Sequence, residues 1–476
     1  MPRQVVRSVA AASLALILGA AACAAPSAPA DAAAAAGGEE SLNARLVGTN
    51  DLQARSAYQP LPVVQGARRI LYVGHHAGEA LNPLTGESEQ NGTSIVDVTD
   101  PANPVYLHHI PPTGGARGAQ MVQVCPGREL PGAPDDSYFL LRPNGNQSHE
   151  VWNVTDPASP EFVTTVVTMG TTPDGETNTH KNWWECDTGI AYLVGTRDGW
   201  RAPRILQVYD LSSPVAPRHL RDFSLPGVEP GATGPVPGGS GVHEVTRVGN
   251  RLYVAYGTSN SGVIQILDRG RLLRGDVEVE IGRLDMPAFW GAHTALPLLG
   301  VEIGDYAGNR DQRVRDFVVV VSESVGNQCQ EPRHATWIVD ITDEAHPFSV
   351  ATFQVEESSG GFCDRGGRFG PHSPQWSMGP PLYPQLVAIA YFNAGARVVD
   401  LRNPFQPREV AWYIPAVTDR TDERCVTING VETCKTAIQT NNVEVDDRGL
   451  IYLVDRANTG LHIVELTGPA AEIASR

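Results

Sequence analysis

Four histidines occupy the same position of a repeating pattern in this chain. Each opens a short strand-like run, in the sequences NTHKNWW, GVHEVTRV, GAHTALPL and GPHSPQWS, and they are His180, His243, His293 and His372. Imidazole nitrogen is the commonest protein ligand for transition metals, and strands hold such side chains rigidly. Equivalent positions converge if the repeats close into a ring. The pattern therefore predicts a metal site, for zinc, iron, copper or manganese.

A second set of polar residues ends the strand-like run that follows in each of several repeats. The set comprises His75 and His76, Arg142, Arg197, Glu323, Asn393 and Asp455. Because a second antiparallel strand runs back to the end where the first began, we expect these residues near the histidines. Glu323 or Asp455 is predicted as a catalytic base or as a group that orients the imidazoles. Arg197 or Arg142 is predicted to hold an anionic group of a substrate.

The alternative is that the histidines are structural. Buried imidazoles often hydrogen-bond to backbone between repeats, or they line a wet channel. A lone histidine would favour the structural interpretation, whereas four histidines at one repeat position support the metal site and the structural role equally.

The repeat itself is a strand, a Pro-rich turn and a second strand. SIVDVTDPANPVYLHHI begins at Ser94, and similar phrases follow at spacings of 56 to 72 residues. Aligned on the acidic or amide residue before the turn, they lie at Asp97, Asn153, Asp210, Asp268, Asp340, Asp400 and Glu465. Asp or Asn at a turn start can accept a hydrogen bond from its own backbone two residues on, and proline presets φ at the next corner. A fixed period of this kind predicts a repeat architecture.

Two further strand-like runs precede each phrase, so each repeat supplies four short strands. Seven repeats of four antiparallel strands predict an all-β, seven-bladed β-propeller over residues 46–466, followed by a tail at 467–476. The 48 glycines and 37 prolines suit many tight turns. We expect residues 61–64 to lie beside the last blade where the ring closes, because an open sheet edge invites aggregation.

The repeated phrase resembles the LVIVD-repeat proteins, a family of bacterial secreted or surface propellers. SIVDVTDPANP, WIVDITDEAHP and RVVDLRNPFQP carry the resemblance most closely, and it extends over most of the chain from about Arg69. The phrases around Asp268 and Glu465 depart from the pattern. The resemblance implies the propeller fold and export, but it implies no activity.

The N-terminus predicts export. Residues 1–22 have two arginines, an apolar stretch and then small residues, which is typical of a signal peptide. Cys23 follows in AAAC, which resembles the site of bacterial lipid attachment, and residues 23–45 read as a low-complexity tether. We expect a lipoprotein of the cell envelope that contacts the membrane only through a lipid on Cys23. The alternative is ordinary cleavage near residues 20–25 and secretion.

Six further cysteines allow fifteen pairings, which an oxidising compartment would permit to form. Cys425 and Cys434 flank an Asn-Gly hairpin signal, so we predict that they pair. The other predicted disulfides are Cys329–Cys363, between loops of the fifth repeat and its exit, and Cys125–Cys186, between the first strands of neighbouring repeats. No Cys-x-x-Cys spacing supports a thiolate metal cluster instead.

Charge and motifs narrow the function. The formal net charge of −17 without a basic stripe argues against nucleic-acid binding, and no phosphate loop, dinucleotide fingerprint or Gly-x-Ser-x-Gly is present. Two hypotheses remain. One is a metal-dependent enzyme that acts on a small-molecule substrate at the histidine-ringed channel mouth. The other is a non-catalytic binding or adhesion module that uses its long loops to hold a cell-surface ligand.

Overall fold

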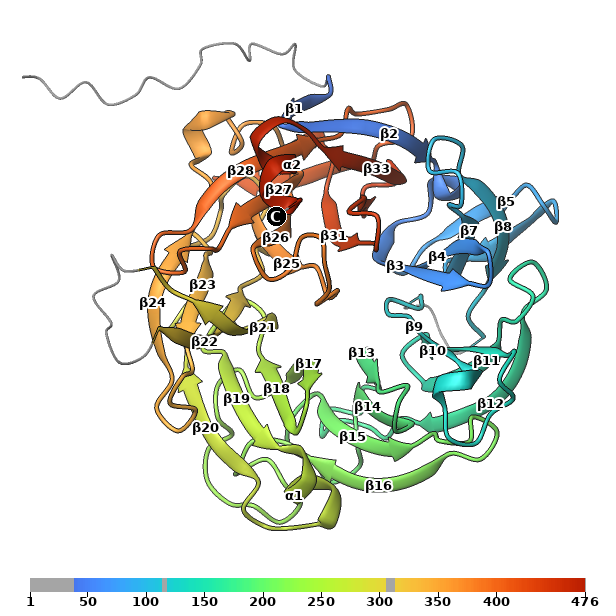
Figure 1. Ribbon diagram of the computed structural model, residues 1–476, viewed down its shortest axis with the longest axis vertical. Coiled ribbons are helices and arrows are strands. Elements are labelled where there is room, and N and C mark those ends of the chain that lie inside the picture. Colours follow the sequence, from blue (N-terminus) through green and yellow to red (C-terminus); the bar gives the residue numbers. More distant parts are fainter. Residues whose placement is uncertain (1–37, 114–117, 305–312, 476) are drawn as a thin grey trace, which may run out of the picture.

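Antiparallel sheets arranged around a central axis make up the fold, a β-propeller (Figure 1). The structure is a computed structural model that describes residues 38–113, 118–304 and 313–475. The predicted signal peptide, Cys23 and most of the predicted tether lie outside these residues. The all-β propeller predicted from the repeats is confirmed.

Five of the sheets have four strands each, which follow one another in chain order from the axis outward. The first contains β3 (Ala57–Gln65), β4 (Arg68–His75), β7 (Thr93–Asp97) and β8 (Val105–Ile110). The second contains β9 (Gln123–Pro126), β10 (Tyr138–Asn144), β11 (Ser148–Asn153) and β12 (Glu161–Thr168). The third contains β13 (Thr179–Trp184), β14 (Ile190–Gly195), β15 (Ile205–Asp210) and β16 (Arg218–Phe223). The fourth contains β17 (Val242–Val248), β18 (Arg251–Tyr256), β19 (Val263–Asp268) and β20 (Glu280–Asp285). The fifth contains β21 (Thr294–Glu302), β22 (Val314–Val321), β23 (Thr336–Asp340) and β24 (Phe348–Phe353).

The last two repeats form a single nine-stranded sheet. One part contains β25 (Phe369–Pro374), β26 (Leu386–Phe392), β27 (Ala396–Asp400), β28 (Arg408–Ile414) and the added edge strand β1 (Glu40–Leu42). The other contains β31 (Thr440–Val445), β32 (Ile451–Asp455), β33 (Leu461–Leu466) and β2 (Ala44–Asn50). A single residue pair, Phe392 with Thr440, joins the two parts. The number of blades therefore depends on whether this sheet is counted as one blade or two.

The ring is closed by the N-terminal strand β2, which pairs antiparallel with β33 as the outer strand of the last repeat. Residues 61–64 belong to β3, which lies beside β31 and β32 of the last repeat as expected, but the strand that pairs with that repeat is β2. The sheet also begins at Glu40, earlier than the expected boundary at residue 46. Pairing the N-terminal and C-terminal strands covers an edge that would otherwise be open.

The repeated turn has the predicted chemistry. In five repeats the residue at the turn start accepts a hydrogen bond from the backbone N–H two residues on, at 2.9 to 3.0 Å: Asp97, Asn153, Asp210, Asp340 and Asp400. Asp268 differs, because it caps the short helix α1 (Arg269–Arg274) by accepting from the N–H of Arg271. Glu465 differs too, because its carboxylate pairs with Arg45 of the closing strand. The two departures in the sequence are therefore departures in structure.

The hydrophobic core lies between neighbouring sheets. Val319 of β22 and Ile389 of β26, for example, belong to one buried cluster between the fifth repeat and the next. The inner and central strands are buried on both faces, and all seven residues of β26 are buried. Such strands read as continuous apolar runs, which is why they are easily recognised in the sequence.

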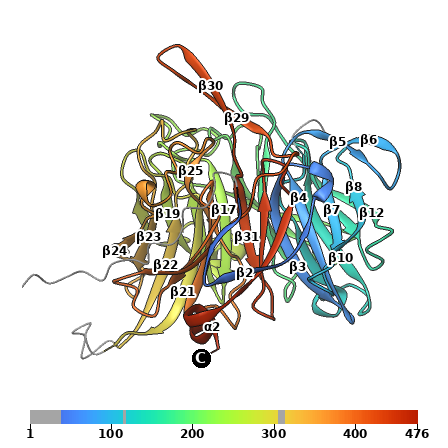
Figure 2. The same ribbon diagram turned by 90° about the horizontal axis from the view of Figure 1, so that it is seen from above.

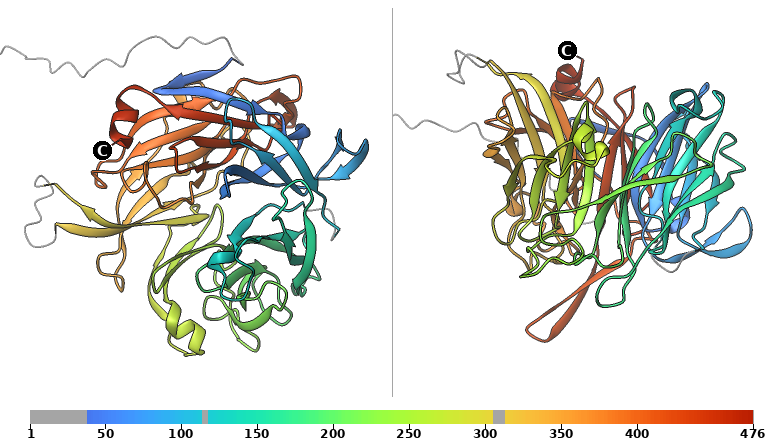
Figure 3. Two further views of the ribbon diagram at one scale, coloured as in Figure 1. Left: turned by 45° about the vertical axis from the view of Figure 1, so that its right-hand side comes forward. Right: turned by 90° about the horizontal axis from the view of Figure 1, so that it is seen from below.

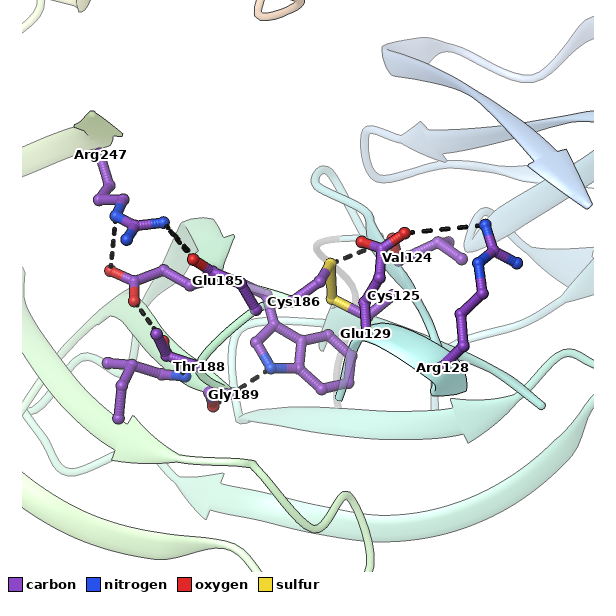
Figure 4. Close-up of a disulfide and its surroundings, with 12 residues drawn as sticks. Val124, Cys125, Arg128, Glu129, Glu185, Cys186, Thr188, Gly189 and Arg247 are labelled. Carbon is purple, nitrogen blue, oxygen red and sulfur yellow. Dashed lines mark hydrogen bonds and ion pairs between the residues drawn. A yellow bond between two sulfur atoms is a disulfide. The ribbon is translucent and has the colours of Figure 1, made fainter. Parts of the chain in front are cut away.

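All three predicted disulfides are present: Cys125–Cys186, Cys329–Cys363 and Cys425–Cys434. The first connects the inner strand β9 of the second repeat with the turn that follows β13 of the third repeat (Figure 4). Beside it, the buried carboxylate of Glu185 pairs with Arg269 and Arg247 from the next repeat. The disulfide and these ion pairs connect three consecutive repeats.

Additional hairpins and a helix lie outside the main sheets of the ring. The hairpin of β29 (Glu423–Ile428) and β30 (Val431–Thr436) projects from one face, and the C-terminal helix α2 (Gly468–Ala474) lies at the other (Figures 2 and 3). A smaller hairpin of β5 (Glu79–Asn82) and β6 (Glu87–Gln90) follows β4. The remaining elements are 3-10 turns at Leu52–Ala54, Gly127–Glu129 and Glu357–Ser359.

Neither of the two α-helices of the described residues has the length and apolar character that a membrane span needs.

Candidate metal centre

Irregularities in the inner strands place the candidate ligands at one end of the central channel. At the start of these strands the pairing with the second strand skips residues, and the skipped positions include Tyr58, His180, His243, His372 and Asn441. A β-bulge of this kind bends a strand and redirects a side chain. His293 lies immediately before β21, where its N–H donates to the carbonyl of Val321. The shared bulge position makes the side chains converge.

The four histidines form a continuous arc of contacting rings. The centroids lie 4.3 Å apart for His180 and His243, 3.8 Å for His243 and His293, and 4.3 Å for His293 and His372. Nε2 of His180 lies 2.7 Å from Nε2 of His243. All four side chains are buried. The structure thus brings together the four residues that the repeat pattern singled out.

Hydrogen bonds at the outer side of the arc fix the tautomers of its two end members. Nδ1 of His180 lies 2.8 Å from Oε1 of Gln120, and Nδ1 of His372 lies 2.6 Å from the backbone carbonyl of Asn441. Because both oxygens can only accept, both Nδ1 atoms carry the proton. The lone pairs therefore lie on Nε2 of both rings. This is how hydrogen-bonded partners orient histidine ligands around metals.

A fifth histidine, His76, lies beside the arc but differs in its partners. Its Nδ1 is 3.0 Å from Nε2 of Gln120, which donates, and its Nε2 is 3.3 Å from Oδ1 of Asn441, which accepts. Both ring nitrogens are thus satisfied by protein. The same Gln120 side chain fixes His76 and His180, so His76 is a supporting residue rather than a ligand.

Glu323 adds a carboxylate beside the third and fourth histidines of the arc. Its oxygens lie 3.6 Å from Nε2 of His293 and 3.7 Å from Nε2 of His372. One oxygen accepts a hydrogen bond of 2.9 Å from Arg368. The ligand atoms of His243, His293 and Glu323 all lie within 4.8 Å of one another. This is close to the separation of about 4 Å that two ligands on one ion can reach at bonds of about 2.0 to 2.2 Å.

Three of the four ring nitrogens on the two inner histidines lack hydrogen-bond partners. Nδ1 of His243 and both nitrogens of His293 are buried without one. Burial lowers the pKa of all four rings of the arc well below the ordinary value, and the nearby positive charge of Lys181 lowers it further. The rings are therefore neutral at neutral pH, and neutral imidazole is the form that binds metals.

The channel is filled directly below the arc. Lys181 and Glu244, the residues after His180 and His243, form a buried ion pair. The Lys181 ammonium lies 5.5 Å from the ring centre of Trp376, which packs with Tyr58 and Met121 in a small buried cluster. A ligand must therefore approach the histidines from the opposite side, where Glu323 and Arg368 lie.

Three predicted residues do not join the site. Asp455 is buried, but its carboxylate accepts hydrogen bonds from the backbone N–H groups of Gln439, Ala457 and Thr459, so it shapes a loop. Arg197 turns to the outer strand, where it pairs with Asp222 at 3.0 Å.

Arg142 is buried against Glu150 and donates to the carbonyls of Ile110 and Pro111. Its role, like that of Asp455, is structural. The prediction failed for these residues because the end of a second strand offers several side-chain directions, and sequence spacing does not distinguish them.

Other residues of the site were not predicted as such. Tyr58 opens the first strand of the first repeat, and its hydroxyl lies 3.4 Å from Nε2 of His180. It could have been found by extending the repeat alignment upstream, because it holds the position that histidine holds in four other repeats. Arg368 lies directly before β25, where no period marks it, and Arg456 follows β32 at the repeat position that His76 has in the first repeat.

Comparisons with known proteins bear on the fold alone. No protein-family model matches the chain, and no curated protein matches its sequence. Among solved structures it is similar to the WD40 repeats of RRP9, with 10% identity and a TM-score of 0.49 over 89% of this chain and 97% of that chain. It is similar to U3-55K, with 10% identity and a TM-score of 0.49 over 89% and 98%. It is also similar to the computationally designed protein Ika8, with 9% identity and a TM-score of 0.43 over 88% and 99%.

Proposed function

We propose that the protein is a metal-dependent enzyme that binds one transition-metal ion at the channel histidines and acts there on a small substrate. The proposed ligands are His180, His243, His293 and His372, with Glu323 as a fifth ligand or as the catalytic base. Zinc, iron, copper and manganese are the candidate ions, since mixed imidazole and carboxylate ligands suit them. A bound ion would polarise a substrate oxygen or activate a water molecule.

The observation that carries the proposal is the set of buried imidazole nitrogens without hydrogen-bond partners. Three such nitrogens lie on His243 and His293, in the middle of the arc. A buried polar atom without a partner costs about 1 to 3 kcal/mol, so native structures rarely keep several in one place. A cation on the inner side of the arc would bind the lone pair of one nitrogen on each of these two rings.

The tautomers argue against a purely structural cluster. Nε2 of His180 and of His372 present lone pairs. That of His180 faces Nε2 of His243 at 2.7 Å, whereas no hydrogen-bond donor among the described residues contacts that of His372. A structural network would need a donor facing each lone pair, as the side-chain amide nitrogen of Gln120 faces Nδ1 of His76. The contrast between the satisfied His76 and the unsatisfied His293 supports a ligand role for the arc.

Elemental analysis of the purified protein tests the proposal. We expect about one equivalent of a transition metal per chain after dialysis, and loss of that metal in the double variant His243→Ala/His293→Ala. The matched control is His149→Ala/His462→Ala, since these two histidines are also buried but contact no member of the arc. Circular dichroism and urea unfolding show whether each variant is folded.

Two results would contradict metal binding. One is wild-type protein that holds no metal after incubation with each of the four ions. The other is equal metal content in the arc variant and the control variant.

The position of Gln120 allows a finer test. Gln120→Leu removes no ligand but releases Nδ1 of His180 from its acceptor. Loss of such an orienting partner typically weakens metal binding by about 10- to 100-fold. A competition titration with a chromogenic chelator measures this change, and unchanged affinity would show that the hydrogen bond does not orient a ligand.

A non-catalytic binding module is the second candidate function, and the β29–β30 hairpin favours it. The hairpin projects beyond one face of the ring, is held by Cys425–Cys434, and exposes Val431 at 66%. A cell-surface ligand would bind there and not at the histidines. Binding of the protein to cell-envelope preparations should then be lost when residues 425–434 are replaced by a short turn, and kept in the histidine variant. The reverse pattern would reject this candidate.

We further propose export and membership of the LVIVD-repeat family. The three disulfides support an oxidising compartment. The family assignment is supported by the shared hydrogen-bonded turn after the third strand in five repeats. Mass spectrometry of the N-terminal peptide from the native host would test whether Cys23 carries lipid.

A further inference from the structure

We propose that the ligand of this site is a small oxyanion, a carboxylate or a phosphate, held between the metal and the guanidinium group of Arg456. This inference rests on the proposed metal site, and it adds the chemical class of the substrate.

Arg456 lies at the channel mouth by its place in the repeat. It follows Asp455, which pairs with Thr440 at the start of the inner strand β31. His76 has the same position in the first repeat, directly after His75, which pairs with Ala57. Arg456 therefore stands where His76 stands, around the same opening.

The backbone of Arg456 is firmly held, but its guanidinium group is not. Its N–H donates to the carbonyl of Gln439 at 2.9 Å, and its carbonyl accepts from Ser56 and Arg424 at 2.8 Å each. The side chain is only partly exposed. Among residues 38–113, 118–304 and 313–475 it forms no hydrogen bond and no ion pair through the guanidinium. A guanidinium in such a place is normally paired.

The electrostatics place this positive charge near the arc. Arg456 contributes to lowering the pKa of His76 and of His372. Burial lowers the pKa of Arg456 itself to about 10, and the nearby charge of Arg368 lowers it further, while Glu323 raises it. The charged side chain is thus destabilised by its surroundings, and an anion beside it would relieve that cost.

The charge balance of the site requires an anion once a metal is bound. Lys181 is neutralised by Glu244, and Arg368 by Glu323. The four histidines of the arc are neutral, so a divalent ion adds two positive charges to a buried site beside the partly exposed Arg456. Excess charge in a low-dielectric environment is costly, and a negatively charged ligand removes it.

The geometry of the groups selects the type of anion. A guanidinium group offers two parallel N–H donors that match the oxygens of a carboxylate or a phosphate. The Lys181–Glu244 pair and Trp376 fill the channel below the arc, so a small anion would enter from the face that carries Arg456 and Arg368. One oxygen would reach the metal while the others contact Arg456.

Calorimetric titration of the metal-loaded protein tests the inference, with inorganic phosphate and malonate as probes at fixed ionic strength. We expect Arg456→Gln to weaken binding by about 10- to 100-fold, which corresponds to one charge-assisted pair of hydrogen bonds. Arg456→Lys keeps the charge without the planar donors, and we expect an intermediate loss. The control is Arg218→Gln, which removes an exposed arginine that pairs with Asp210 on the outer strand, and we expect wild-type affinity.

The outcomes separate this inference from the metal site. Metal-loaded wild type that takes up neither probe at millimolar concentration would overturn the oxyanion, as would equal affinities of Arg456→Gln and Arg218→Gln. If Arg456→Gln does not fold, the comparison of Arg456→Lys with wild type decides, and equal affinity rejects the inference. Wild type without metal in elemental analysis overturns the proposed function and this inference together. Tighter binding of phosphate than malonate, or the reverse, assigns the oxyanion to one class.

Discussion

Replacing His293 by leucine should change the stability of the protein in opposite directions with and without metal. His293 is fully buried, forms no hydrogen bond through either nitrogen, and contacts the rings of His243 and His372. Leucine has a similar volume and no polar atoms. Without metal, His293→Leu therefore removes unsatisfied groups and leaves little cavity.

The size of the expected change in the free energy of unfolding follows from these contacts. A buried polar group without a partner costs about 1 to 3 kcal/mol, so the free energy of unfolding of metal-free His293→Leu should exceed that of wild type by about that amount. With metal at a hundred times its Kd, wild type gains about 2.7 kcal/mol through binding to the native state. The variant loses a central ligand, so it should gain much less. The order of stability then reverses.

Urea unfolding in a chelator and in excess metal measures both differences. His462→Leu is the control, because His462 is also buried with an unpartnered Nδ1 but lies on β33, outside the arc. We expect it to gain from metal as wild type does. The reasoning is refuted if metal-free His293→Leu is less stable than wild type by several kcal/mol, or if metal stabilises the variant as much as wild type.

Three other predictions concern the scaffold. Burial lowers the pKa of His462 to about 4, so between about pH 6.5 and 4 the unfolded state binds a proton that the folded state does not, and this residue should cost about 1.4 kcal/mol of stability for each pH unit. The urea midpoint of His462→Leu should therefore fall less steeply with acid than that of wild type, and equal slopes would contradict this. Replacing both Cys125 and Cys186 by serine should lower stability by about 4 kcal/mol, and removing Cys425–Cys434 should lower it by about 3 kcal/mol, because Cys125–Cys186 closes the longer loop. A larger loss for Cys425–Cys434 in thermal unfolding would argue against loop entropy as the cause. Lys181→Met should lower stability by about 3 to 5 kcal/mol because it leaves Glu244 buried and unpaired, and the double variant Lys181→Met/Glu244→Leu should recover most of that loss. A double variant as unstable as the single variant would show that the ion pair itself stabilises the fold.

The fold was readable from the sequence because its determinants are local. The turn residues Asp97 and Asp400 accept hydrogen bonds from the backbone N–H two residues on, and the flanking apolar runs pack between sheets. The sequence of each repeat therefore determines the structure of that repeat. The disulfide pairs were also predictable, since a hairpin signal between Cys425 and Cys434 and the places of the other four cysteines in the repeats put partners side by side. The closing strand β2 was missed, because its pairing with β33 joins residues more than four hundred positions apart, and no period marks the start of β2.

The histidine positions came from the sequence by itself, since a repeat that closes into a ring brings equivalent residues together wherever they stand in the chain. Only the tertiary structure decided what surrounds them. Gln120 fixes the tautomer of His180, Glu323 turns inward, and Asp455 turns away into a loop. Arg456 follows β32 at the mouth, and its guanidinium group has no hydrogen-bond or ion-pair partner among the described residues. These outcomes depend on bulges, on loop paths and on which polar groups are left unsatisfied after packing. Such features are set by contacts between distant segments and leave no local signal in the sequence.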